Sequence, residues 1–264
     1  MLQIRNLTKI FSAGTGNERK AVTNINLSVE SGEFLCLIGG NGAGKSTLMN
    51  LVAGTYMPDS GRITLERKDI TYLSEHKRAK QIGHLFQDPL LGTAPNMTIE
   101  ENLSLAYLRG KRRGLKRAVS KKNAPFFKEQ LRLLDLGLED RLKTQVGLLS
   151  GGQRQAITLL MATLAAPTLL LLDEHTAALD PATADKVLCL TENIQRESKI
   201  TTLMITHNIE SALRAGTRTL MLQQGKIILD IKGKEREEMT VERLLRMFRQ
   251  KSGKSLNNDR MLLS

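Results

Sequence analysis

The fold of this chain can be inferred first from the sequence Gly39-Gly40-Asn41-Gly42-Ala43-Gly44-Lys45-Ser46-Thr47. It follows an apolar run over 34–38 that predicts a buried strand, and it leads into a run that predicts a helix beginning near Lys45. Glycines allow backbone N–H groups to turn inward around phosphate oxygens, and the helix directs the positive end of its dipole at the same anion. We therefore expect a phosphate-binding loop between a strand and a helix.

The polar side chains of this loop each suit one task in binding a nucleoside triphosphate. Lys45 brings a positive charge to the terminal phosphates, Ser46 places its hydroxyl on Mg²⁺, and Thr47 can donate a further hydrogen bond. A glycine-rich turn without function is the alternative, but such a turn does not require Gly39, Gly44 and Lys45 at this spacing. Kinases, GTPases, motors and transport ATPases share the loop, so it leaves the reaction open.

A second anion-binding helix start is predicted at Leu149-Ser150-Gly151-Gly152-Gln153. The apolar-rich run 154–164 continues it as a helix, with Ser150 as the N-cap residue. An ordinary capped helix with a flexible glycine pair is the simpler alternative. One chain with two such helix starts either binds two anions or closes one nucleotide between two copies of itself.

The third motif is the leucine run 169–172, followed by Asp173 and Glu174. Its length predicts a buried parallel strand over 169–174 that ends in two carboxylates. Consecutive side chains on a strand point to opposite faces, so the two acids can take different roles; alternatively, they only close the strand at the sheet edge. A transition-metal site that includes His175 is disfavoured, because diverging neighbours on a strand do not easily share one ion.

In this order the three motifs resemble those of the ATP-binding cassette (ABC) transporter family, and the resemblance covers nearly all of residues 1–231. It implies ATP and Mg²⁺ as cofactors and an ATPase activity coupled to transmembrane transport. In that family the signature pentapeptide of one subunit covers the terminal phosphate held by the phosphate loop of the other, which implies a homodimer. The residues implied to bind the nucleotide are Phe11, Gly39, Gly40, Asn41, Gly42, Ala43, Gly44, Lys45, Ser46, Thr47, Ser150, Gly151, Gly152, Gln153 and Asp180.

The same resemblance implies catalytic and metal-binding roles. Glu174 resembles the general base that polarises the attacking water, and His207 resembles the switch histidine near the terminal phosphate. Gln87, which follows an apolar strand, resembles the glutamine that reaches the metal and the water and also touches the membrane partner. Asp173 is implied to support Mg²⁺ together with Ser46 and Gln87.

Two further residues take roles from the resemblance, and two positions depart from it. Phe11 is implied to stack on adenine, and Asp180 to lie in the loop that crosses the dimer interface. Gly40 stands where many members carry Pro, and His175 stands where Pro usually follows the catalytic Glu. The run 173–181 resembles a subgroup of ATPases that serve importers with a solute-binding protein and a single permease, some of them assigned to tryptophan or tyrosine uptake.

Length and cysteine usage restrict the setting of the protein. The chain has 264 residues, and its two cysteines, Cys36 and Cys189, lie far apart in apolar runs. This favours neither a disulfide framework nor a metal site and is typical of a reducing cytoplasm. The sequence shows neither an apolar run near the ~18 residues of a membrane span nor the start of a signal peptide. We therefore expect a peripheral protein on the cytoplasmic face of the cell membrane, which transports through permease subunits.

The expected fold class is α/β: a P-loop ATPase core with a mostly parallel sheet, an N-terminal antiparallel β subdomain and an inserted helical subdomain. The antiparallel strands are predicted over 2–10, 21–29 and 62–67. A single ABC ATPase domain is expected over 1–250. Its parts are a nucleotide-binding core at 1–87 and 150–231, a helical subdomain at 88–149 and a C-terminal extension at 232–250, followed by a flexible tail at 251–264.

Local signals place helices in the insert and near the C-terminus. Thr98 and Glu101 predict a capping box, Pro125 the start of a second helix, and Gly137 its end. A short amphipathic helix is predicted near the end of the chain. Its apolar side chains are Val241, Leu244, Leu245 and Phe248.

The net charge of +12 allows three interpretations: binding to nucleic acid, binding to an anionic membrane surface, or plain solubility. Its densest cluster lies in the predicted insert and comprises Lys111, Arg112, Arg113, Lys116, Arg117, Lys121 and Lys122. A solvated loop is the default explanation. The alternative hypothesis is that this cluster faces anionic lipid beside the permease.

The resemblance favours the ATP-binding and ATP-hydrolysing subunit of a membrane transporter, an importer of a small solute such as an amino acid, working with a solute-binding protein. A soluble ABC-type ATPase acting on ribosomes or nucleic acid is the alternative, and the basic charge would suit it. Members of those classes usually carry two cassettes in one chain or long heptad insertions, which this sequence does not contain, so no nucleic-acid partner is expected. A P-loop kinase would leave the signature pentapeptide unexplained.

Overall fold

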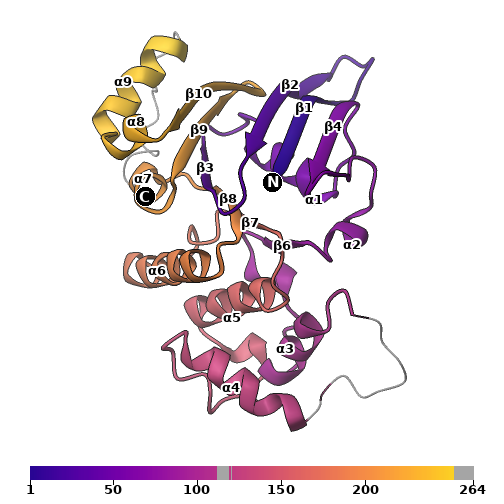
Figure 1. Cartoon of the computed structure of the whole chain (residues 1–264), viewed down its shortest axis with the longest axis vertical. Helices are drawn as coiled ribbons and strands as arrows, with labels where there is room; N and C mark the ends of the chain where they lie inside the picture. Colours follow the sequence, from indigo (N-terminus) through magenta and orange to yellow (C-terminus); the bar gives the residue numbers. More distant parts are fainter. Residues whose placement is uncertain (112–118, 120, 253–264) are drawn as a thin grey trace. The chain divides into compact units, whose positions relative to one another are not determined.

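In the computed structural model, which describes residues 1–111, 119 and 121–252, the chain divides into two units (Figure 1). The first unit comprises residues 1–78 together with the chain from 199 onward. The second comprises residues 79–198. Both contain strands and helices, in agreement with the predicted α/β class.

The alternating N-terminal segments form an antiparallel sheet in the first unit. Its strand order is β2-β1-β4-β5. The strands are β1 Leu2–Phe11, β2 Arg19–Val29, β4 Ser60–Leu65 and β5 Lys68–Asp69. Leu2, Ile4 and Leu7 of β1 are buried, and the spacing changes from two to three because Asn6, with a φ of 48°, interrupts the regular register. The predicted antiparallel subdomain is confirmed.

The third predicted strand ends earlier than expected. β4 stops at Leu65, and Glu66 and Arg67 form the turn into β5 with φ angles of 49° and 64°. Positive φ at both central residues gives the turn a twist that matches the paired strands. The prediction over 62–67 missed this turn because neither residue is the Gly or Asn that usually signals it.

A second set of strands in the first unit carries the predicted buried strand. It comprises β3 Phe34–Ile38, β8 Thr201–Ile205, β9 Arg218–Gln223 and β10 Lys226–Lys232, in the order β10-β9-β3-β8. β3 is parallel to β8 and β9, whereas β9 and β10 form an antiparallel hairpin. Every residue of β3 and β8 is buried, which is why these strands are apolar throughout instead of alternating. The predicted strand over 34–38 is confirmed.

The helices of the first unit flank these strands. They are α1 Lys45–Ala53, α2 Glu75–Arg78, α7 Ile209–Ala215, α8 Lys234–Glu237 and α9 Val241–Ser252. Figure 1 shows α8 and α9 beside β10, with α9 also against α7. Leu244 and Phe248 of α9 are buried, while the helix presents charged side chains elsewhere, so the predicted amphipathic helix is confirmed.

The second unit contains two parallel strands and a group of helices (Figure 1). The strands are β6 Ile82–Leu85 and β7 Leu169–Asp173, paired from Ile82 with Leu169 to Leu85 with Leu172. The α-helices are α3 Ile99–Tyr107, α4 Ala124–Arg132, α5 Gly151–Thr163 and α6 Pro181–Ser198. Single 3₁₀ turns are η1 Pro89–Gly92, η2 Lys121–Asn123 and η3 Val146–Leu148.

Helices α3, α4 and α5 share one apolar core within the second unit. Its buried members are Ile99, Leu103, Ala106, Phe127, Leu131, Leu134, Leu138, Leu142, Val146, Leu149, Ala156, Ile157, Leu160 and Met161. The predicted capping box starts α3: the Glu101 N–H donates to Thr98 Oγ1 at 3.3 Å, and the Thr98 N–H donates to Glu101 Oε2 at 2.7 Å.

The end of α4 differs from the prediction. The helix stops at Arg132 and not at Gly137, because Asp135 takes a left-handed conformation with a φ of 52°. Asp tolerates this conformation, and the Asp135 N–H donates to the Arg132 carbonyl at 3.1 Å in the closing turn. Leu134 remains buried beyond the helix end, and Gly137 belongs to the turn that follows.

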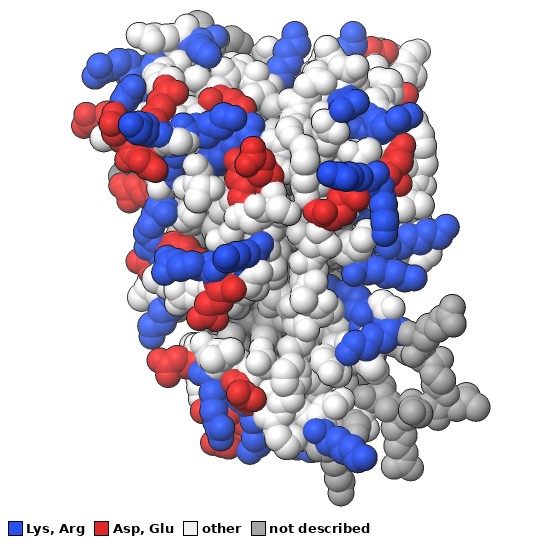
Figure 2. Space-filling model, in the orientation of Figure 1, with Lys and Arg blue, Asp and Glu red and all other residues white. Residues whose placement is uncertain are grey.

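The surface carries both signs of charge. Figure 2 shows Lys and Arg side chains spread over the visible face, with Asp and Glu side chains among them. Four residues of the basic cluster, Arg112, Arg113, Lys116 and Arg117, lie outside the described residues, as do 253–264 of the predicted tail. The lipid-facing role of that cluster and the domain boundaries stay predictions. Within the described ranges, no helix has both the length and the apolar character needed to span a membrane.

Candidate functional site

The phosphate loop lies in the first unit, between the end of β3 at Ile38 and the start of α1 at Lys45. Two of its glycines are required by close backbone neighbours. A Cβ on Gly39 would lie 2.3 Å from the Leu222 carbonyl oxygen, and a Cβ on Gly44 would lie 2.3 Å from the Ala21 carbonyl oxygen. Both glycines also have positive φ, so the loop path excludes side chains at these positions.

The cation of the loop is held inside it. Lys45 is 5% exposed, and its Nζ donates to the carbonyl oxygens of Gly39 at 2.7 Å and Gly40 at 3.3 Å. These contacts place the positive charge of Lys45 within the loop, where it can act on a bound anion. Ser46 is exposed at the first turn of α1, where a hydroxyl can reach a bound ion.

Arg19 is a residue at this loop that the sequence motifs did not reveal. Its Nη2 donates to the Gly42 carbonyl oxygen at 3.2 Å. Arg19 pairs directly with Phe11 across β1 and β2, and side chains opposite each other on antiparallel strands share a face. Arg19 therefore connects the predicted adenine-stacking residue with the phosphate loop. Only the strand register reveals this arrangement.

Phe11 itself ends β1 in a partly buried position. Its ring meets the ring of Tyr56 edge to face, with centroids 5.4 Å apart, and Lys9 Nζ lies 5.6 Å from its centroid. Tyr56 and Lys9 thus hold the ring in place, and the ring stays partly accessible, as stacking on a base requires.

The first unit also brings the predicted switch histidine to the phosphate loop. His207 follows β8, and the next residue, Asn208, caps α7 by accepting from the Ser211 N–H at 2.8 Å. One small cavity is lined jointly by the loop, by His207 and by the C-terminal helix. Its lining residues are Ile38, Gly39, Gly40, His207, Ile209, Met221 and Phe248.

The signature pentapeptide lies in the second unit and starts α5 as predicted. Ser150 is the N-cap residue, and it forms a capping box with Gln153, each backbone N–H donating to the other side chain at 3.3 Å. Ser150 and Gly151 are exposed whereas Gly152 is buried. An exposed, capped helix start with small residues is suited to contact a phosphate from outside.

The two acids after the leucine run differ from the sequence-based expectation. β7 ends at Asp173, and Glu174 lies outside the strand with a φ of 46°. The side chains of Asp173 and Glu174 therefore diverge through a backbone turn, and not through the pleat of a continued strand. A left-handed conformation at a residue other than Gly costs of order 1 kcal/mol, and such positions cluster at functional sites.

His175 is a buried structural residue. It is 3% exposed, and its Nε2 lies 3.2 Å from Thr191 Oγ1, whose hydroxyl donates to the Val187 carbonyl at 2.8 Å. The His175 ring thus donates to Thr191, and burial lowers the pKa of His175 to about 4. Among the described residues there is no group of three His, Cys, Asp or Glu side chains placed to hold a metal ion.

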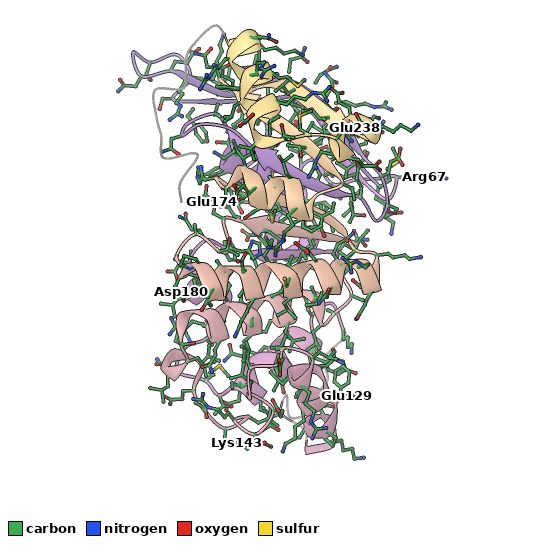
Figure 3. The ribbon with its side chains drawn as sticks, turned by 90° about the vertical axis from the view of Figure 1, so that its left-hand side faces the viewer. Arg67, Glu129, Lys143, Glu174, Asp180 and Glu238 are labelled. Atoms are coloured by element: carbon green, nitrogen blue, oxygen red, sulfur yellow. The ribbon has the colours of Figure 1, made fainter. Side chains whose placement is uncertain are left out.

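Gln87 and Asp180 both lie in exposed loops next to regular elements, as the sequence predicts. Gln87 is exposed two residues beyond β6, next to Asp88, which caps η1 by accepting from the Leu90 N–H at 2.9 Å. Asp180 precedes α6 and accepts from the Thr183 N–H at 3.1 Å; hydrogen bonds from Thr183 lower the pKa of Asp180. Figure 3 shows Asp180 at the N-terminal end of α6.

The predicted site residues are therefore grouped by unit. The first unit brings together the phosphate loop and His207 around one cavity, with Phe11 joined to the loop through Arg19. The second unit carries the others: Gln87, Ser150, Gly151, Gly152, Gln153, Asp173, Glu174 and Asp180.

Comparison with known proteins identifies the family. The family model for the ABC transporter matches residues 22–177, which include the phosphate loop and the signature pentapeptide. The tyrosine transport ATP-binding protein of Clostridioides difficile (strain R20291) is 48% identical over 248 residues, covering 94% of this chain and 98% of that protein. The aliphatic sulfonates import ATP-binding protein SsuB of Albidiferax ferrireducens is 36% identical over 230 residues, covering 87% of this chain and 73% of that protein.

Solved structures agree with the sequence comparison. The dimeric post-hydrolysis state of the ATP-binding cassette MJ0796, bound to ADP and Pi, has a TM-score of 0.75 and 28% sequence identity, with 88% of this chain and 98% of that chain covered. A nucleotide-free ATP-binding cassette from an ABC transporter has a TM-score of 0.74 and 27% identity, with 89% and 92% covered. The chain belongs to the ABC transporter family, as an ATP-binding and ATP-hydrolysing subunit of the importer type.

Proposed function

We propose that this subunit hydrolyses ATP to drive the uptake of an amino acid through a separate permease, from the cytoplasmic face of the cell membrane. The observation that carries the proposal is the 48% identity, over nearly the full length of both chains, to a protein named for tyrosine transport. Tyrosine is therefore the first substrate to test. A solute-binding protein that delivers the substrate completes the proposed system, as the likeness of the run 173–181 to that subgroup implies.

The proposed reaction depends on positioning and electrostatics. Lys45 and the backbone amides of the loop would hold the phosphates, and Phe11 would stack on the base. Mg²⁺ would neutralise charge on the transferring phosphoryl group, and the oxygen donors at Ser46, Gln87 and Asp173 suit a hard cation. Residues that act on the water are Glu174, as general base, with His207 and Gln87.

A homodimer that encloses ATP at its interface would use both predicted anion-binding helix starts. The phosphate loop at α1 would hold the nucleotide of one copy, and Ser150 with Gly151, Gly152 and Gln153 of the other copy would cover its terminal phosphate. Asp180 would lie at the same interface. A similar cassette that is dimeric and bound to ADP and Pi supports this arrangement.

The proposed docking region for the permease lies on the second unit, near Gln87. Its support is a set of large apolar side chains that this unit exposes, since apolar side chains at the surface can be buried by a partner. They are Leu90, Leu91, Leu105, Phe126, Leu133 and Leu148. Movement of Gln87 and this region would pass the closure of the dimer to the permease.

Purification of the tagged chain from membranes tests the proposal. We expect a hydrophobic permease to co-purify, and we expect cells without this gene to lose the uptake of labelled tyrosine. Glu174→Gln should not restore that uptake although it should still bind ATP, because binding does not require the general base. Co-purification of ribosomes or nucleic acid without a permease would contradict the transport function and favour a soluble ATPase.

A further inference from the structure

The C-terminal extension of the first unit holds α7 at its C-terminal end. Arg236 of α8 is 6% exposed, and its Nη2 donates to the carbonyl oxygens of Ala212 at 2.8 Å, Leu213 at 2.6 Å and Gly216 at 2.9 Å. Its Nε donates to Thr219 Oγ1 at 2.8 Å. The last carbonyls of a helix have few partners within the helix, so Arg236 adds hydrogen bonds at the C-terminal end of α7, where the Ala212 carbonyl also accepts from the Gly216 N–H at 3.2 Å.

The same extension reaches the N-terminal end of α7 through α9. Phe248 is 5% exposed and lines the small cavity that His207, Gly39 and Gly40 also line. Ile209, the first residue of α7, belongs to the same lining. The extension therefore reaches both ends of α7, the helix that begins two residues after His207.

We propose that Phe248 is a positioning residue for ATP hydrolysis: it fixes His207 against the phosphate loop, while Arg236 fixes the other end of α7. The inference rests on the proposed function, in which His207 acts near the terminal phosphate. None of the family motifs includes Phe248, and the match to the family model ends at residue 177. The opposite face of α9 carries exposed charged side chains, and only the buried face that carries Phe248 is directed at this site.

The packing around the phosphate loop explains how Phe248 could affect His207. Gly39 cannot carry a side chain and Gly40 has none, so the space beside the loop must be bounded by side chains from other elements, and the ring of Phe248 is one of them. Removing the ring would leave space into which His207 and Gly40 can shift. A displacement of about 1 Å in a catalytic group can cost about 10²-fold in rate, even when the substrate still binds.

The test compares Phe248→Ala with Leu245→Ala in the full chain. Leu245 lies on the same helix and is partly buried, but it does not line the cavity. We expect Phe248→Ala to lower kcat for ATP hydrolysis at least about 10-fold with KM changed less than about twofold, and Leu245→Ala to change neither. Phe248→Leu, which refills most of the space, should recover most of the rate. An unchanged kcat in Phe248→Ala, or an equal loss in Leu245→Ala, would overturn the inference.

A double-mutant cycle with His207→Ala separates this inference from the proposed function. If Phe248 acts through His207, the variant with both changes should be no slower than His207→Ala alone. Additive losses would show that Phe248 acts by another route and would overturn the inference. Full turnover by His207→Ala would instead contradict the proposed role of His207 itself. If Phe248→Ala does not fold, the same cycle with Phe248→Val, which still leaves part of the space open, decides between these outcomes.

Discussion

Gly152 of the signature helix and Thr183 of α6 lie in contact at the starts of their helices: a Cβ on Gly152 would be 2.1 Å from Thr183 Cγ2. The Thr183 backbone N–H also donates to Asp180, so the signature and the proposed interface loop meet at one residue of the second unit. The contact leaves no room for a side chain at position 152. Because α5 and α6 touch here, a shift of α5 would also displace the loop that carries Asp180.

Gly152→Ala is therefore expected to destabilise the protein by about 1–3 kcal/mol, because the added methyl group must push Thr183 away. The melting temperature measures this loss. Gly151→Ala is the matched control, since its Cβ would lie 3.4 Å from Leu179 Cδ2, an ordinary contact. Adding Thr183→Ser, which removes Cγ2 and keeps the hydroxyl, should restore stability to Gly152→Ala. Equal melting temperatures for the two glycine variants would contradict the contact.

Arg19→Ala should weaken ATP binding by about 5- to 10-fold, because it removes a cation beside the phosphate loop and the hydrogen bond to Gly42. Titration with a fluorescent ATP analogue measures the change. The neighbouring Lys20→Ala removes an equal charge from an exposed position and is the control. The difference between the two variants should shrink at high salt, since salt screens an exposed charge. Equal affinities at low salt would exclude Arg19 from the binding site.

The free energy of unfolding should decrease as the pH is lowered, because of two histidines that are withdrawn from water: His175 is buried and His84 is half-buried. Burial lowers the pKa of His175 from 6.5 to about 4, and that of His84 to about 4 as well. Below about pH 6.5 the unfolded chain binds protons that the folded chain rejects, so the stability present above that pH is lost as the pH falls toward about 4. For His175 alone the loss between about pH 7.5 and about pH 5 is about 2 kcal/mol.

His175→Gln isolates that contribution, because its amide can still donate to Thr191. Urea unfolding at several pH values should give this variant a shallower dependence than the parent, with the share of His84 remaining. His76→Gln, at an exposed position, is the control and should keep the parent slope. An unchanged slope in His175→Gln would show that His175 does not titrate as a buried neutral ring.

Arg78 should be essential for the stability of the first unit. It is 2% exposed and donates to the carbonyls of Leu51 at 2.6 Å and Val52 at 2.9 Å, at the end of the helix that begins at the phosphate loop. Arg78→Lys should cost about 2–4 kcal/mol in urea unfolding, because one ammonium cannot reproduce the planar set of donors. The adjacent exposed Lys77→Arg should have little effect. A cost below about 1 kcal/mol for Arg78→Lys would contradict this role.

Short sequence motifs correctly predicted the structural features that are determined by residues adjacent in the chain. The strand before the phosphate loop, the helix at Lys45 and the capping box at Ser150 each follow from a few adjacent residue types, and the structure contains them. The capping box at Thr98 is a further case. Such features are determined by backbone hydrogen bonds and φ preferences within one or two turns.

Features that depend on distant residues could not be predicted in this way. The contact of Arg19 with Gly42 requires the register of β1 and β2, and the place of Phe248 requires the packing of the C-terminal extension. The turn at Glu174 was missed because a run of leucines followed by two acids gives no signal for a left-handed residue. Asp135 likewise ends α4 without the glycine that usually marks a helix end.

In the proposed dimer each ATP is enclosed between two chains, held by Lys45 of one and covered by Ser150 of the other. Mixing two inactive variants tests it most directly: Lys45→Ala and Ser150→Arg, each combined with Glu174→Gln so that closed pairs persist. Each variant alone should trap no nucleotide, whereas a mixed pair retains one complete site. We predict that the mixture forms ATP-dependent pairs with one trapped nucleotide for every two chains. A mixture that traps none, as expected if each nucleotide were enclosed within one chain, would show that the two chains do not share the nucleotide sites.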